Sequence, residues 1–223
     1  MTQLEIELNA LKQKLLRMGA AAELSLVEAT RALVERDDDL ARKVALDDDL
    51  LDNLEKEIDE DGITLLTKAP LASQLRLITS AMRIGRDLER IGDEATKIAR
   101  RAGDLNAEAQ LKAFIDIPRM ASLAAGMLKE GLDAFVSGDT AKAREVVKRD
   151  KEVDMLNKQL HRELVSYMIE SPATVTRSLN LMTASKALER IADHAKNIAE
   201  DVVYLYEAKD IRHIGLHSAL PAA

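Results

Sequence analysis

The sequence predicts an all-α protein built of two tandem, pseudo-symmetric three-helix bundles. Its 223 residues are 47% hydrophobic but only 2% aromatic and include no Trp, so the core must consist of Leu, Ile, Val, Ala and Met, as is typical of packed helices. Apolar residues recur three and four positions apart along most of the chain, which indicates helical faces. One phrase also occurs twice, about one hundred residues apart, which indicates an internal repeat.

The repeat divides the chain into two halves. Residues 88–100 read LERIGDEATKIAR and residues 188–200 read LERIADHAKNIAE, with eight identities in thirteen positions. Upstream, residues 42–54 align with 144–156 at a shift of 102, and Pro70 aligns with Pro172 at the same shift. We therefore predict a first bundle at residues 1–104, a second at 105–211, and a flexible tail at 212–223.

Local signals place the helices of each half. In the first half we expect helices at about 2–36, 38–67 and 70–101. Asp37 is expected to cap the second of these, and Pro70 to occupy the first turn of the third. The linker between the halves is assigned to Gly103, Asp104 and Asn106.

The second half has clearer punctuation. We expect helices at about 111–137, 139–170 and 172–208. Gly138 and Asp139 indicate a helix end followed at once by a helix N-cap. Ser171 before Pro172 indicates a second N-cap, followed by a proline in the first helical turn. Short connections of this kind favour antiparallel neighbouring helices.

Charge and composition exclude several classes of protein. The net charge of −7 argues against a nucleic-acid-binding protein, which needs a basic surface. The absence of cysteine excludes disulfides and thiolate metal sites. The acidic N-terminus does not resemble a signal peptide, and no run approaches the roughly 20 apolar residues that span a bilayer. We expect a cytoplasmic protein.

Carboxylates four residues apart recur at equivalent positions of the repeat. Such neighbours repel by a few tenths of a kcal/mol on an exposed helix, so their recurrence calls for an explanation. On a helical wheel the pairs of the third helices, Glu89 with Asp93 and Glu189 with Asp193, lie away from the core face. We expect these four acids to face solvent. The candidate metal ligands are Asp48 and Asp52, Glu89 and Asp93, Asp150 and Asp154, and Glu189 and Asp193.

Two interpretations of these pairs stay open. If the second and third helices of a half are antiparallel neighbours, their acidic pairs face each other and could hold a hard cation through oxygen ligands. Alternatively the acids are ordinary solvated surface, copied together with the rest of a duplicated gene. The spacing does not choose among Zn, Fe, Mn, Mg and Ca.

No catalytic constellation accompanies the acids. The sequence lacks a phosphate-binding loop, a dinucleotide fingerprint and the Glu-x-x-His motifs of a di-iron bundle. We therefore expect a protein that is not an enzyme. A metal-dependent phosphohydrolase is the weaker alternative, and a purely structural scaffold is another. Arg90 and Arg190 could bind a phosphate or a partner carboxylate, but we favour a surface ion pair with Glu94.

The phrases ERIGDEATKIA and ERIADHAKNIAE, each preceded by a DxxxD helix, resemble the PhoU family of regulators of phosphate-specific transport. The resemblance extends from about Leu11 to His213. It implies two similar three-helix bundles with metal bound at surface E(D)xxxD motifs, which here are the eight acids named above. One departure is Lys97, which stands where the second half has Asn197, so we expect weaker or no metal in the first half.

The same resemblance implies partners and a role. Proteins of this family restrain phosphate uptake and the phosphate-starvation response. They contact the ATPase subunit of the phosphate ABC transporter and a membrane-bound sensor histidine kinase. We accordingly expect negative regulation through protein contacts, a homodimer, no nucleic-acid binding and no insertion of this chain into the membrane.

Overall fold

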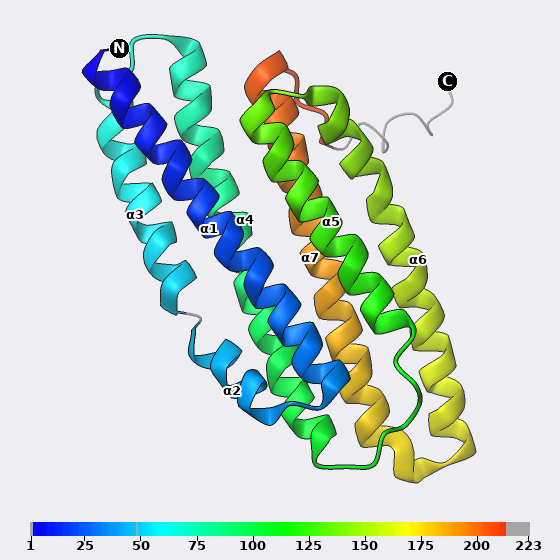
Figure 1. Cartoon of the computed structure of the whole chain (residues 1–223). Helices are drawn as coiled ribbons and strands as arrows, with labels where there is room; N and C mark the ends of the chain where they lie inside the picture. Colours follow the sequence, from blue (N-terminus) through cyan, green and yellow to red (C-terminus); the bar gives the residue numbers. More distant parts are fainter. Residues whose placement is uncertain (1, 48, 213–223) are drawn as a thin grey trace, which may run out of the picture.

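The computed structural model describes residues 2–47 and 49–212. Residue 48 lies outside them, as does the predicted tail at 212–223 except for Arg212. Within these residues the secondary structure is entirely helical (Figure 1). The elements are α1 (Gln3–Glu35), α2 (Asp38–Leu46), α3 (Asp49–Leu66), α4 (Ala72–Asn106), α5 (Asp116–Ser137), α6 (Thr140–Glu170), the 3-10 turn η1 (Pro172–Thr174) and α7 (Val175–Glu207). The predicted all-α class and the repeated three-helix arrangement are confirmed.

The long third helices of the two halves, α4 and α7, lie antiparallel at the centre of the molecule (Figure 1). In the first half α1, α2 and α3 pack against α4, and in the second half α5 and α6 pack against α7. Helices α1 and α5 also contact each other, so the buried apolar residues of both halves form one continuous core. The core stripe expected on α7 is buried as predicted, including Leu188, Ile191, Ala195 and Ile198.

Several helix ends follow the chemistry of their residues. The Asp37 side chain accepts a hydrogen bond from the Leu40 N–H at 2.9 Å, and Asp139 accepts one from Lys142 N–H at 2.9 Å. Gly138 ends α5 with a φ of 71°, a left-handed conformation that costs glycine little. These predicted caps are confirmed.

Three predicted boundaries are wrong. Helix α4 begins at Ala72 rather than Pro70, and it continues through the predicted linker to Asn106. Residues 107–115 make the actual connection, so α5 begins at Asp116 rather than near Leu111. Arg36 explains part of the extension of α4, because its guanidinium donates to the carbonyls of Leu105, Asn106 and Glu108. These bonds satisfy carbonyls that a helix end leaves without partners. The division of the chain at residue 104 stays a prediction.

The predicted helix at 38–67 is two helices, since α2 ends at Leu46 and α3 begins at Asp49. The sequence at this point is Asp-Asp-Asp, whereas the aligned residues 149–151 are Arg-Asp-Lys in the continuous helix α6. Aspartate is a weak helix former, because its side chain competes for nearby backbone hydrogen-bonding groups. The two halves therefore differ where the repeat has changed its charges.

Candidate functional site

Four carboxylates of the second half meet along the contact between α6 and α7. We call Asp150, Asp154, Glu189 and Asp193 the second-half acidic cluster. Burial, followed by the charges of Asp150 and Glu189, raises the pKa of Asp193 to about 6. Asp154 adds to this effect. The acidic pairs of the two helices are therefore close enough to interact, as the antiparallel arrangement predicted.

The expectation that the acidic pairs of the third helices face solvent is wrong for Glu189. Asp150 is only 6% exposed and Glu189 only 9% exposed, while Asp154 and Asp193 are partly buried. The reason is that α7 contacts α4, α5 and α6 at once, so more of its circumference is covered than a single core face would require. A carboxylate at such a depth needs a compensating cation or hydrogen bond.

Two lysines supply part of that compensation. Lys196 Nζ donates to Asp150 Oδ2 at 2.9 Å, and Lys186 Nζ lies 2.5 Å from Glu189 Oε2. Burial is the largest single effect and lowers the pKa of Lys196. The hydrogen bond to Asp150 and the charges of Asp150, Asp193 and Glu200 together outweigh it, so the pKa of the lysine is raised. The Lys196 interaction was not predicted. Its signal was present, because Lys196 follows Glu189 by seven residues and therefore lies on the same side of α7.

The equivalent acids of the first half lie on α3 and α4. We call Asp52, Glu89 and Asp93 the first-half acidic cluster; the fourth candidate, Asp48, lies outside the described residues. Burial and then the charge of Asp93 raise the pKa of Glu89 above its ordinary value. Asp52 contributes in the same direction, which shows that α3 brings its acid towards α4. All three described acids are partly exposed, in contrast to Asp150 and Glu189.

The cation beside the first-half acidic cluster is Arg90. Its guanidinium lies 3.3 Å from Glu89 Oε2 and 3.2 Å from Asp93 Oδ2. Lys97, which we expected to weaken this site, instead donates to Glu94 Oε1 at 2.8 Å. The physical reason for expecting weaker metal binding here is therefore Arg90 and not Lys97. The weaker binding itself stays a prediction.

Polar contacts also join the two halves across α4 and α7. Arg190 Nη1 lies 3.3 Å from Glu94, so the predicted partner of Arg190 is confirmed, although Glu94 is buried rather than on the surface. The same pairing is wrong for Arg90, which contacts Glu89 and Asp93. The His194 Nδ1 atom lies 2.8 Å from Asp87 Oδ1. Further along, Arg83 Nε lies 2.9 Å from Oδ1 of the buried Asp201, whose pKa burial raises to about 6 although Arg83 opposes the shift. These pairs fix the register of α4 against α7.

A second polar group lies further along α6 and α7. His161 Nε2 is 3.1 Å from Ser185 Oγ, and that hydroxyl donates to Asn157 Oδ1 at 2.8 Å. Ser185 is fully buried, so its hydroxyl cannot reach a substrate in solution. This group therefore joins the two helices rather than forming a nucleophile and base.

The donor chemistry of the second-half acidic cluster fits a hard cation, since all four of its side chains offer carboxylate oxygens. The Oδ1 atom of Asp150 is buried and has no hydrogen-bond partner among the described residues. However, within residues 2–47 and 49–212 no three His, Cys, Asp or Glu side chains are already arranged as a metal-binding group. A cation would therefore have to draw these carboxylates together and replace the lysine contacts.

Whether a helix can span a membrane depends on the length of its apolar stretch. None of the helices in the described part of the chain has a stretch both long and apolar enough to span a bilayer.

Comparison with known proteins agrees with the repeat. The family model described as PhoU domain matches residues 15–102 and again 117–202. A phosphate-specific transport system accessory protein PhoU homolog of Pseudomonas aeruginosa is 43% identical over 216 residues, which is 96% of this chain and 89% of that protein. The homolog of Rhizobium meliloti is 39% identical, over 92% of this chain and 87% of that protein.

Solved structures show the same fold. The crystal structure of PhoU from Pseudomonas aeruginosa matches with a TM-score of 0.90 and 42% identity, covering 93% of this chain and all of that one. The phosphate transport system regulatory protein PhoU from Streptococcus pneumoniae matches with a TM-score of 0.88 and 28% identity, over 94% of this chain and 99% of that one. Sequence, repeat and fold agree that this chain belongs to the PhoU family.

Proposed function

We propose that this chain is a regulatory accessory protein of a phosphate-specific transport system. The observation that carries the proposal is the double match to the PhoU domain, together with relatives of that name that align over almost the whole chain. We further propose that it acts in the cytoplasm as a homodimer. There it restrains phosphate uptake and the phosphate-starvation response, and its partners are the transporter ATPase subunit and the sensor histidine kinase.

The second-half acidic cluster is the proposed metal site. Asp150, Asp154, Glu189 and Asp193 would hold the ion between α6 and α7. The support is the crowding of carboxylates that raises the pKa of Asp193 to about 6, together with the unpaired buried oxygen of Asp150. A bound divalent or iron-type ion would supply positive charge and crosslink the two helices. The first-half acidic cluster is a second, weaker candidate.

Lys196 is the residue that we expect to respond to the ion. In this structure its ammonium compensates Asp150 at 2.9 Å, and the charge of Glu200 also favours the protonated lysine. A cation at Asp150 would repel the ammonium, and Glu200 lies one helical turn further along α7. Occupancy of the site would thus change the contacts of α7 beyond the ligands themselves.

The regulatory proposal is tested in cells. The gene is deleted, and a phosphate-starvation reporter such as secreted phosphatase is recorded in phosphate-rich medium. We expect high activity in the deletion strain and repressed activity after the wild-type gene is restored. Repressed activity in a strain that lacks both this gene and any second PhoU gene would contradict negative control. Co-elution of the purified chain with the transporter ATPase tests the contact separately.

A further inference from the structure

An apolar ridge runs along the exposed side of α1. Leu24 is 55% exposed, Val27 is 48% exposed, and Val34 continues the row. Their separations of three and seven residues place them on one side of the helix. This face is directed away from the core residues Leu26 and Leu33 of the same helix. Exposed large apolar residues that gather in this way typically mark an interaction surface.

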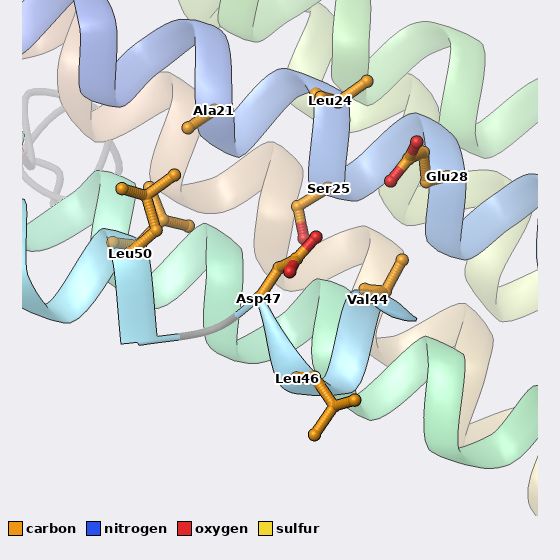
Figure 2. Close-up of a pocket in the computed structure, with 9 residues that line it drawn as sticks. Ala21, Leu24, Ser25, Glu28, Val44, Leu46, Asp47 and Leu50 are labelled. Atoms are coloured by element: carbon orange, nitrogen blue, oxygen red, sulfur yellow. The ribbon is translucent and has the colours of Figure 1, made fainter. Parts of the chain in front are cut away.

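A first hollow borders this ridge where the helix of the first half is interrupted. It lies between α1 and the junction of α2 with α3, and it has a volume of about 360 Å³ (Figure 2). Leu24 lines it from α1, and the exposed Leu46 and Leu50 line it from the ends of α2 and α3. The second half has a continuous α6 in place of α2 and α3. The hollow therefore depends on the interruption near Asp47.

A second hollow borders the other side of the ridge, between α1 and the start of α5. It has a volume of about 430 Å³ and is lined by Val27 and Val34 of α1 and by Pro118, Ala121 and Ala125 of α5. The small side chains of α5 keep this space open. The ridge and its two hollows together offer places for apolar side chains of a partner on both sides of α1, and we call them the α1 surface.

The charges around the α1 surface are mainly acidic. Glu28 and Asp47 line the first hollow, where Lys43 Nζ donates to both Glu28 oxygens at 2.8 Å. Arg31 and Glu35 both line the second hollow and lie 3.6 Å apart as an ion pair. The adjoining sequence 37–49 contains six aspartates against Arg42 and Lys43. A twofold contact of this surface with a second copy would bring acidic rims together, and an anionic membrane would be repelled as well. A basic partner has the complementary charge.

We propose that the α1 surface binds an amphipathic, basic helix of a partner protein, with apolar side chains in the two hollows and Lys or Arg facing the acidic rim. Helices commonly bind to apolar grooves in this way, through residues three and four positions apart. Asp47, at the interruption of the helix, lines the first hollow and contributes to its acidic rim. The inference concerns a surface distinct from the acidic clusters and holds whether or not these bind metal.

The probe is a fluorescent 18-residue helical peptide with leucines three and four positions apart and lysines elsewhere. Its binding to the full chain is measured by anisotropy and compared with that of a peptide in which glutamate replaces every lysine. We expect the glutamate peptide to bind at least about tenfold more weakly. We expect Val27→Lys and Leu50→Lys each to weaken binding of the lysine peptide by about tenfold, because each substitution places a lysine in the lining of one hollow.

The matched control is Ile169→Lys on α6. It adds the same single positive charge, at a residue that is 78% exposed and lies outside both hollows. It should alter binding by less than about twofold. Equal weakening by all three substitutions would show nonspecific attraction and overturn the proposal. It would also be overturned if Val27→Lys converted a dimer into a monomer in sedimentation, or abolished binding to phosphatidylglycerol vesicles. Those outcomes would assign the surface to a second copy or to a membrane.

Discussion

The two acidic clusters arise from one repeated sequence but occupy different environments. In the second half Asp150 and Glu189 are buried, and Lys196 and Lys186 contact them. In the first half the described acids are partly exposed and Arg90 is their cation. The repeat has thus kept the carboxylates while changing their burial and their counter-cations. Equivalent carboxylates do not make equivalent candidate sites, because burial and nearby charge decide how strongly they would favour a bound ion.

The largest expected difference between the halves is in metal stabilisation. We expect Glu189→Gln with Asp193→Asn to remove most of the rise in melting temperature that Mn²⁺, Zn²⁺ or Fe²⁺ produces, while circular dichroism shows unchanged helicity. An ion at a hundred times its Kd adds about 2.7 kcal/mol, which corresponds to roughly 5–10 °C for a chain of this size.

The matched control is Glu89→Gln with Asp93→Asn, which should retain most of that rise. A wild-type melting temperature that no divalent ion changes would instead favour the scaffold interpretation. Loss of the fold in the second-half variant would show that these carboxylates are needed for folding itself.

A somewhat smaller effect is expected from Lys196. Lys196→Thr copies the aligned Thr96 and removes the ammonium next to Asp150. We expect about tenfold tighter metal binding in titration calorimetry, together with lower stability of the metal-free protein because Asp150 loses its partner. Lys196→Arg keeps the charge and should resemble the wild type. If the wild type binds the ion and Lys196→Thr binds it with the same affinity, then Lys196 does not influence the metal site, although the site itself still exists.

The pH dependence of stability should reveal the raised pKa of Asp193 in the second half. The pKa of Asp193 is about 6 in the folded chain, against an ordinary value of 3.8. The folded state therefore binds the proton more tightly than the unfolded state, and this contribution to stability is lost as pH rises from about 4 to 6. Denaturant titrations of the metal-free wild type should show a decline over that range. The decline should be smaller in Asp193→Asn, where Asp201 and Glu89, whose pKa values are also raised, still contribute. An equal decline in both proteins would contradict the assignment to Asp193.

The smallest expected effect separates Arg90 from Lys97. Arg90→Gln should increase the metal response of the first half, because Arg90 contacts both Glu89 and Asp93. Lys97→Asn copies Asn197 and should leave the response unchanged, because Lys97 contacts Glu94. Both variants are measured by calorimetry in the Glu189→Gln, Asp193→Asn background, so that only the first half responds. A gain from Lys97→Asn alone would restore the explanation based on the sequence alignment.

The sequence by itself determined the helical class, the repeat and the core stripes, since these depend on spacing along one helix. Leu188, Ile191 and Ala195 are buried as their periodicity predicted, and Asp37 and Asp139 cap helices as their residue type predicted. The break of the second helix was missed, although the contrast of Asp-Asp-Asp with Arg-Asp-Lys was visible in the alignment of the two halves.

Only the tertiary structure decided which acids are buried and which cation each one contacts. A helical wheel assigns one core face, but α7 is covered by three other helices, and this places Glu189 in the interior. Arg190 of the second half likewise reaches Glu94 of the first, a contact between residues 96 positions apart. Periodicity describes one helix at a time, whereas burial and ion pairing depend on which helices pack together.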